Sequence, residues 1–209
     1  MENSIEQGKV AVIDIGSNSL RFVVFDSYGR YPYPLFNERI TCRLGEGVQK
    51  TKKLKKDRIQ QSLETIKRFS KIIDEAKLET VLVIGTAALR LAKNAEDFIE
   101  PAEKFLGNKI RILSGTEEAN LVARGLTANI PKANGIIADL GGGSLELIKI
   151  ENGKIIDSTS LNFGHLIDVE EKSFQKIIKK LKWKNDSENE LWKFIFFRYV
   201  ARVLANCYL

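Results

Sequence analysis

The order of apolar patterns along this chain predicts an α/β fold with a mixed sheet. Three strand-like runs come first, and helical and strand-like segments then alternate. Strand-like runs return at residue 135, where a second aspartate-and-glycine turn repeats one near the N-terminus. Because the second turn has the same construction as the first, we expect two lobes, over 1–125 and 126–209.

Apolar runs of strand length, and apolar residues spaced three or four apart, place the individual elements. Strands are expected at 9–15, 20–26, 36–42, 80–85, 109–113, 135–140, 144–150 and 154–161. Helices are expected at 57–76 and 94–106, and a third begins near Ser114. Glu151-Asn152-Gly153 predicts a hairpin turn. The segment 127–134 is expected to link the two lobes.

Polar residues and one proline define the expected helix boundaries. Asp57 is expected to open the first helix, and Asn94 to cap the second. Pro101 lies inside the second helix and should kink or interrupt it, because proline lacks the backbone N–H. Ser114 and Glu117 match a capping box at the start of the third helix.

Two glycine-rich turns carry the clearest chemical signal. Asp14 precedes the turn Gly16-Ser17-Asn18-Ser19, and Asp139 precedes the turn Gly141-Gly142-Gly143-Ser144. Glycine lets backbone N–H groups converge on an anion, serine hydroxyls add donors, and the aspartates suit Mg²⁺. Either turn alone is a plausible hairpin, and neither fits the Walker or dinucleotide pattern. Two turns of the same order predict a phosphate clamp closed from both sides.

Composition limits the class of protein. Hydrophobic residues make up 44% of the 209, enough for a folded core. No apolar run approaches the ~20 residues that span a bilayer, and the polar segment 1–9 is not a signal peptide, so we expect no membrane partner. Cys42 and Cys207 predict reduced thiols in a cytoplasm. His165 is the only histidine, so any metal must be held by carboxylates.

Positive charge is concentrated in residues 43–58. Seven basic residues stand there against Glu46 and Asp57, a local charge of +5 within a chain of net charge +6. The run is either a solvated loop and helix start or an electrostatic funnel for a polyanion. Aromatic residues are not interleaved with it, which favours a phosphate polymer over nucleic acid.

With these segments in place, the chain resembles the exopolyphosphatase / guanosine pentaphosphate phosphatase (Ppx/GppA phosphatase) family. The motifs that carry the resemblance are Ile13-Asp14-Ile15-Gly16-Ser17-Asn18-Ser19, Arg43-Leu44-Gly45-Glu46-Gly47, Gly85-Thr86-Ala87-Ala88-Leu89-Arg90, Ser114-Gly115-Thr116-Glu117-Glu118-Ala119 and Asp139-Leu140-Gly141-Gly142-Gly143-Ser144-Leu145-Glu146-Leu147. The resemblance implies an actin-like (ribonuclease H-like) ATPase fold, with one complete lobe and a shortened second lobe.

The same resemblance assigns roles to residues. Glu118 looks like the residue that orients the attacking water, which is consistent with Glu117 serving the cap and leaving its neighbour free to face the cleft. Asp14, Asp139 and Glu146 look like the acids around Mg²⁺ or Mn²⁺. The phosphate-binding set it implies is Gly16, Ser17, Asn18, Ser19, Arg90, Gly141, Gly142, Gly143 and Ser144. We interpret His165 as structural, because a single histidine is weak evidence for catalysis.

The expected activity is removal of the terminal phosphate of inorganic polyphosphate or of guanosine pentaphosphate. The alternative is a catalytically dead remnant that binds polyphosphate or nucleotide. Half of an ATP-dependent sugar kinase is a third interpretation, disfavoured because Glu118 in its Ser-Gly-x-Glu-Glu context points to hydrolysis. The sequence does not choose between the two phosphatase substrates.

The C-terminal part departs from the family pattern. The family's second lobe runs further, so we expect a C-terminally truncated member whose end, from 195 to 205, resembles only a helix of that lobe. Aromatic and aliphatic residues cluster at 192–209 and predict self-association through this segment. Residues 166–209 are expected to be the least stable part of the chain.

Overall fold

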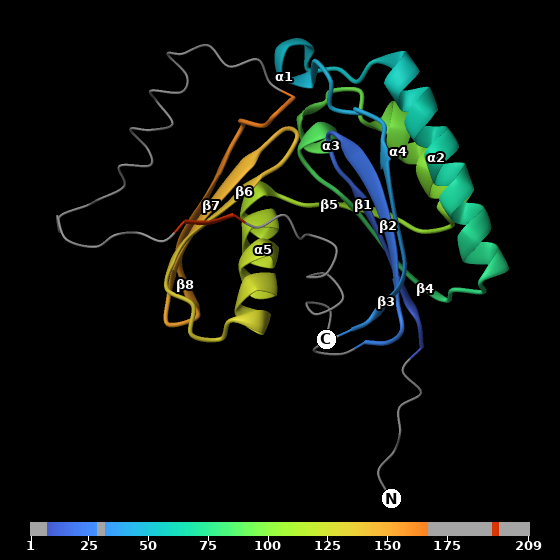
Figure 1. The fold of residues 1–209 in the computed structure, drawn as a ribbon. Coiled ribbons are helices and arrows are strands. Elements are labelled where there is room, and N and C mark those ends of the chain that lie inside the picture. Colours follow the sequence, from blue (N-terminus) through green and yellow to red (C-terminus); the bar gives the residue numbers. More distant parts are fainter. Residues whose placement is uncertain (1–7, 29–31, 167–193, 197–209) are drawn as a thin grey trace, which may run out of the picture.

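The computed structural model describes residues 8–28, 32–166 and 194–196 (Figure 1). Its first sheet contains β1 (Val10–Ile15), β2 (Ser19–Phe25), β3 (Pro34–Thr41), β4 (Thr80–Gly85) and β5 (Ile110–Ile112). The helices that accompany it are α1 (Val48–Thr51), α2 (Lys56–Glu75), α3 (Ala87–Leu91) and α4 (Glu96–Leu106). The remaining elements are α5 (Gly115–Asn129), β6 (Gly135–Leu140), β7 (Leu145–Glu151), β8 (Lys154–Leu161) and β9 (Phe194–Phe196).

The two sheets share one topology. The first has the order β3-β2-β1-β4-β5, with antiparallel pairing along β1, β2 and β3 and parallel pairing along β1, β4 and β5. The second has the order β8-β7-β6-β9, again with antiparallel hairpins on one side of β6 and a parallel partner on the other. The expected α/β fold with mixed sheets is therefore confirmed.

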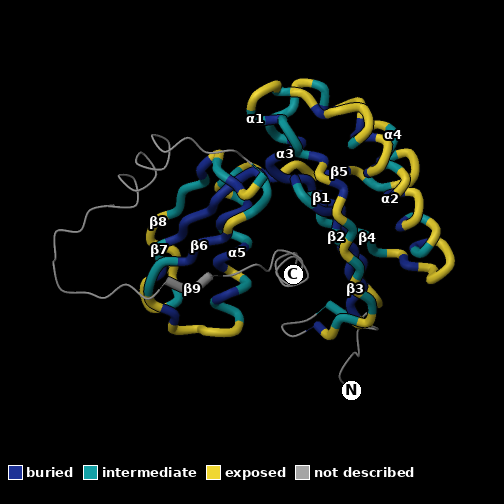
Figure 2. Tube along the Cα trace, turned by 45° about the horizontal axis from the view of Figure 1, so that its top comes forward, coloured by how far each residue is buried: buried dark blue, intermediate teal, exposed yellow. Residues whose placement is uncertain are grey.

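Both faces of the first sheet are covered, which explains why β1 is apolar at every position except Asp14. Alternate side chains of a strand point to opposite faces. Ile13 belongs to a core shared with α2 and α4, whereas Val12 belongs to a core that includes Leu121 of α5. The inner sides of α2 and α4 are buried and their outer sides exposed, as amphipathic helices require (Figure 2).

The helix α5 lies between the two sheets (Figure 1). It buries Ala119, Val122, Ala123 and Leu126 in a core with residues of β6 and β7, while Leu121 packs on the first sheet. Most of its buried face therefore belongs with the second sheet. The lobe boundary at residue 125 stays a prediction.

Several local expectations require correction. Pro101 does not interrupt α4, because the apolar face of this helix packs on α2 and outweighs one lost backbone hydrogen bond. The kink that was the other expected outcome stays a prediction. Asn94 does not cap it; its side chain bonds the backbone N–H of Leu54 at 2.8 Å instead. Likewise, α5 extends to Asn129, so the first three residues of the expected linker are helical.

The predicted capping box and the predicted hairpin turn are confirmed. Ser114 Oγ accepts the backbone N–H of Glu117 at 3.2 Å, and the Glu117 carboxylate accepts the Ser114 N–H at 2.8 Å, which completes the capping box. Asn152 and Gly153 have φ angles of 48° and 74° and connect β7 to β8. Both central residues of this hairpin are thus left-handed, as a tight asparagine-glycine turn requires.

The predicted self-association through 192–209 lies outside the described residues, apart from the backbone of β9. At Ile195 and Phe196 that backbone is a strand rather than the expected helix, because it pairs in parallel with β6. The predicted low stability of 166–209 also falls almost entirely outside the described part.

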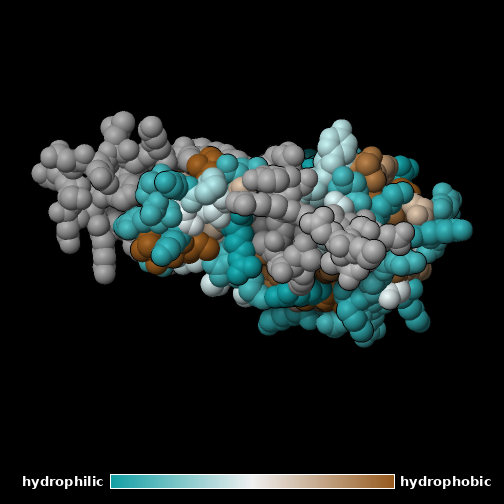
Figure 3. Space-filling view, turned by 90° about the horizontal axis from the view of Figure 1, so that it is seen from below, coloured by the Kyte–Doolittle hydropathy of each residue, from teal (hydrophilic) through white to brown (hydrophobic). Residues whose placement is uncertain are grey.

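The described surface is mostly polar. No helix within the described residues is long and apolar enough to cross a membrane. Among the large exposed apolar side chains, Tyr33 directly precedes β3, Leu35 lies in β3 and Ile156 lies in β8. In the underside view, hydrophobic atoms appear as separate small patches among hydrophilic ones (Figure 3).

Candidate active site

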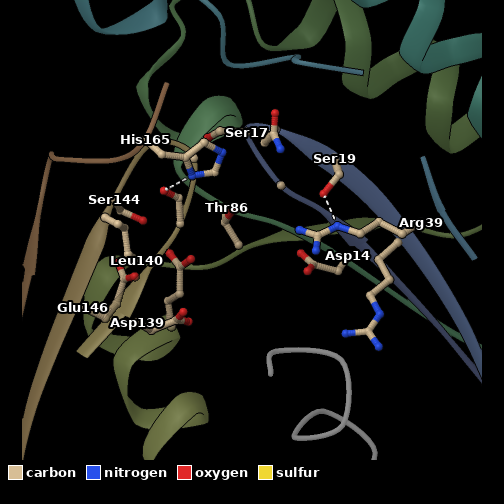
Figure 4. Close-up of a pocket in the computed structure, with 17 residues that line it drawn as sticks. Asp14, Ser17, Ser19, Arg39, Thr86, Asp139, Leu140, Ser144, Glu146 and His165 are labelled. Carbon is tan, nitrogen blue, oxygen red and sulfur yellow. Dashed lines mark hydrogen bonds between the residues drawn. The ribbon is translucent and has the colours of Figure 1, made fainter. Parts of the chain in front are cut away.

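A pocket lies where the two sheets face each other (Figure 4). Its lining consists of Asp14, Gly16, Ser17, Asn18, Ser19, Arg21, Arg39, Thr86, Glu118, Asp139, Leu140, Gly141, Gly142, Gly143, Ser144, Glu146 and His165. In Figure 4, Asp14 and Arg39 project from the first sheet, Asp139 and Glu146 from the second, and Thr86 lies between them. The fold therefore gathers every residue of the predicted site except Arg90 around one pocket.

The two glycine turns that form the pocket have the same backbone construction. The N–H of Gly16 donates to the carbonyl of Ser19 at 3.1 Å, and the N–H of Gly141 donates to the carbonyl of Ser144 at 2.9 Å. Each turn joins two antiparallel strands whose register continues to the aspartate: Asp14 faces Arg21, and Asp139 faces Glu146. Equivalent positions thus carry an arginine in the first lobe and a glutamate in the second.

Glycine allows the two turns to approach each other closely. A Cβ atom on Gly142 would lie 3.0 Å from the backbone nitrogen of Asn18, and one on Gly143 would lie 2.6 Å from the Ser17 hydroxyl. Gln49 of α1 adds a hydrogen bond across the lobes, from its Nε2 to the Gly143 carbonyl at 3.2 Å. The pocket is therefore framed by two turns in direct contact.

Gly164 lies directly against the backbone of the second glycine turn. A Cβ there would clash with the Gly142–Gly143 backbone, because no side-chain movement could relieve the contact. We expect Gly164→Ala to displace the turn and to weaken phosphate binding about tenfold or more. Gly8→Ala is the control, since a Cβ at this glycine outside the pocket would meet no atom within 4 Å. Equal phosphate affinity in the two variants, measured by calorimetry, would contradict this account.

Glu117 and Glu118 are adjacent in sequence but have different environments. Backbone N–H donation from Ser114 and the Arg111 guanidinium lower the pKa of Glu117 to about 2. The side chain of Glu118 is buried and faces the pocket. Arg90 Nη1 donates to Glu118 Oε2 at 3.1 Å and to the Leu113 carbonyl at 2.6 Å. Arg90 therefore contacts the glutamate rather than the pocket itself.

Several acidic side chains line the pocket, and the pKa values of three of them are raised. Burial and the negative charge of Glu118 raise the pKa of Asp14 to about 7, against the opposing charges of Arg21 and Arg39. Burial and Glu118 likewise raise the pKa of Glu146 to about 8, although Ser160 donates a hydrogen bond to its carboxylate at 2.8 Å. Burial also raises the pKa of Glu118 itself, which Arg90 partly offsets.

The pocket acids suit a cation that also contacts phosphate. Burial, and after it the negative charge of Glu118, raises the pKa values of Asp14 and Glu146, and a divalent ion would offset that cost of negative charge. Within the described residues, no three His, Cys, Asp or Glu side chains converge closely enough to hold a metal by themselves. Mg²⁺ commonly takes one or two carboxylates and completes its shell with water and phosphate oxygens, so the residues fit that ion.

The raised pKa values make stability depend on pH. Between about pH 4 and 8 the folded protein binds more protons at Asp14 and Glu146 than the unfolded chain does. The free energy of unfolding should therefore fall as pH rises through this range, by up to about 1.4 kcal/mol for each unit of pKa elevation. Urea midpoints in metal-free buffer at pH 5 and pH 8 measure the effect. Glu146→Gln should flatten the dependence, and the exposed Glu151→Gln on the same strand should preserve it.

Sequence reasoning missed part of the pocket lining. Arg21 and Arg39 project from β2 and β3, and the Arg39 Nε donates to Ser19 Oγ at 2.7 Å. Thr86 follows β4 directly. His165, which we interpreted as structural, lines the pocket with its Nδ1 2.9 Å from the Gly141 carbonyl. The alternation of side chains along a strand could have indicated Arg21, because Arg21 is two residues beyond Ser19 and therefore points to the same face of the sheet.

Comparisons with known proteins identify proteins that are similar to this chain in sequence and in fold. The chain is 30% identical over 166 residues to a guanosine-5'-triphosphate,3'-diphosphate pyrophosphatase of Aliivibrio fischeri. The matched region covers 78% of this chain and 33% of that protein. Among solved structures it is similar to an exopolyphosphatase from Cytophaga hutchinsonii, with a TM-score of 0.70, 27% identity, and coverage of 82% of this chain and 53% of the other.

The structure of a Ppx/GppA enzyme of Aquifex aeolicus is also similar, with a TM-score of 0.69 and 26% identity. The match covers 90% of this chain and 67% of the Aquifex chain. The chain thus spans between one third and two thirds of the length of these relatives. Its mixed α/β fold is the fold of these phosphatase structures, as the motifs implied. A sequence model of the Ppx/GppA phosphatase family matches residues 23–185, which include Glu118 and the second glycine turn. With that match over most of its length, the chain belongs to the Ppx/GppA phosphatase family.

Proposed function

We propose that the protein hydrolyses the terminal phosphoanhydride bond of inorganic polyphosphate or of guanosine pentaphosphate. The observation that carries the proposal is a buried glutamate, Glu118, lining the same pocket as two glycine turns that contact each other. Phosphoryl transfer depends mainly on positioning and charge stabilisation, and this pocket offers groups for both.

The terminal phosphate is held by the two turns. Their backbone N–H groups and the hydroxyls of Ser17, Ser19 and Ser144 supply donors from both lobes. Since Ser19 Oγ accepts the Arg39 N–H, its own hydroxyl proton remains available for a phosphate oxygen. The arginines on β2 and β3 add positive charge on one side of the same pocket.

Glu118 orients the attacking water and accepts its proton. The water oxygen forms a bond to the terminal phosphorus while the bond from that phosphorus to the bridging oxygen breaks. Arg90 fixes one carboxylate oxygen of Glu118, which leaves the other for the water. A raised pKa brings the carboxylate closer to neutral pH, where a general base is most effective.

Asp14, Asp139 and Glu146 are the acids we assign to Mg²⁺ or Mn²⁺. When bound, such an ion neutralises charge on the phosphate oxygens. Ser160 holds the Glu146 carboxylate in place, and Asp139 lies directly opposite Glu146 across the β6–β7 ladder. The second lobe thus keeps two acids side by side on one strand pair.

Both substrates remain within the proposal. The Aliivibrio relative is named for a guanosine nucleotide and the Cytophaga structure for polyphosphate. We place the activity in the cytoplasm, in keeping with the free, buried thiol of Cys42.

The deciding experiment is phosphate release from long-chain polyphosphate and from guanosine pentaphosphate, each with and without Mg²⁺. Release from either substrate that depends on the metal supports the proposal. Tight binding without release would instead support the alternative, a catalytically dead member that binds polyphosphate or nucleotide.

A further inference from the structure

His165 lines the pocket, although the reaction proposed above gives it no role. The residue is exposed and lies in the segment that follows β8. Its backbone N–H donates to the Gly141 carbonyl at 3.1 Å, and its ring Nδ1 lies 2.9 Å from the same oxygen. Two contacts with one carbonyl therefore hold the ring at the second glycine turn.

The contact with Gly141 determines which ring nitrogen carries the proton in the neutral side chain. A carbonyl oxygen can only accept a hydrogen bond, so Nδ1 must be the donor. Within the described residues the other ring nitrogen, Nε2, has no hydrogen-bond partner. When the ring is charged, Nε2 also carries a proton, and histidine exchanges such a proton near neutral pH. His165 can therefore present a transferable proton to a ligand.

The ring and two of the acids lie at different ends of the pocket. In Figure 4, His165 is at the end away from Asp139 and Glu146. Glu118 interacts electrostatically with Glu146, so the proposed base belongs to the acidic end. The attacking and leaving oxygens of a phosphoryl transfer lie roughly in line, on opposite sides of the phosphorus. A water at the acidic end thus directs the leaving oxygen toward the end where His165 lies.

A positive charge on His165 has no carboxylate partner in the part of the chain that the structure describes. The salt bridges found there do not include this residue. The glycine turns themselves carry no charged side chain. The charge is therefore available to an anion in the pocket. The charged side chains that line the pocket with His165 are Asp14, Arg21, Arg39, Glu118, Asp139 and Glu146.

We infer that His165 binds the second phosphate of the substrate through Nε2 and protonates the leaving oxygen. This inference rests on the proposed function and adds an acid to it. The water oxygen bonds to the terminal phosphorus as the bond from that phosphorus to the bridging oxygen breaks. Glu118 takes the water proton, and the Nε2 proton passes to the bridging oxygen. The products are orthophosphate and a substrate shorter by one phosphate, and His165 regains its proton from solvent.

The pH profile of His165→Asn separates this role from support of the turn. An asparagine amide N–H can replace Nδ1 in the bond to Gly141, but it has no group at the position of Nε2. Whichever substrate the protein hydrolyses, kcat should fall about 10²-fold near pH 6. The loss should nearly vanish at about pH 9, above the range in which histidine changes charge. A purely structural role would reduce kcat equally at both pH values.

Asn162→Ala is the matched control for the kinetic test. Asn162 is exposed, lies in the same segment and does not line the pocket. This variant should keep both the turnover and the pH profile of the unaltered protein. A loss of kcat in His165→Asn that is the same at both pH values, or no loss at all, would overturn the inference.

A spectroscopic test does not depend on turnover. His165 is the only histidine of the chain, so its imidazole NMR signals need no assignment. On the full chain carrying Glu118→Gln, tripolyphosphate should shift the Nε2 signal, whereas orthophosphate, which has no second phosphate, should leave it in place. An unmoved signal at saturating tripolyphosphate would overturn the inference. A shifted signal in a protein that hydrolyses neither substrate would support the contact and count against the proposed function alone.

Discussion

Glu118→Gln should reduce phosphate release by about 10²-fold or more while substrate affinity and fold are retained. Glutamine keeps the shape of the side chain and can still accept the Arg90 hydrogen bond through its carbonyl oxygen. It cannot accept a proton from water. The loss should therefore appear in kcat and leave KM nearly constant, which steady-state phosphate release measures directly.

The neighbouring residue provides a matched control. Glu117→Gln makes the same chemical change one position earlier, but Glu117 serves the capping box and Arg111 rather than the pocket. This variant should lose roughly 1 kcal/mol of stability and almost no activity. Unchanged turnover in Glu118→Gln, or an equal loss of kcat in both variants, would sink the assignment of Glu118.

Asp14→Asn should have the second large effect, a fall in activity of about 10²-fold together with a weaker response to Mg²⁺. The aspartate lies at the end of β1, and its raised pKa shows that a negative charge there is costly without a counterion. Removing the charge removes the attraction for the cation. Titration of activity with Mg²⁺, after treatment with EDTA, measures both changes.

Asp157→Asn on β8 is the corresponding control, because that aspartate is exposed and does not line the pocket. It should keep the magnesium response of the unaltered protein. Full activity in excess EDTA would contradict the metal assignment for all three acids, and it would leave the role of Glu118 intact.

The sequence was sufficient to predict the strands, caps and turns that depend on a few adjacent residues. The apolar runs of β1 and β6, the capping box at Ser114 and the turn at Asn152 each result from a few adjacent residues, and the structure confirms them. The two glycine turns were also recognisable, because an aspartate followed by small residues repeats in the same order at Asp14 and Asp139.

Features that depend on distant contacts could not be predicted. The bond from Arg90 to Glu118, twenty-eight residues away, is one such feature. The expected contact of Arg90 with phosphate stays a prediction. Arg39 reaches the pocket only because β3 pairs with β2 and brings it beside Ser19. Pro101 was expected to disturb α4, but packing against α2, not local propensity, decides that helix.

The position of α5 between the two sheets has a mechanical consequence. Glu118 lies in the first turn of this helix, whose buried face packs mainly on the second sheet, whereas Asp14 belongs to β1 of the first. The proposed base and one proposed metal ligand thus belong to different halves of the molecule. Any rotation of one half against the other changes their separation and with it the alignment of water and phosphate. A ligand that touches both glycine turns would fix that angle, so that the chemistry proceeds only when the phosphate itself has locked the two halves together.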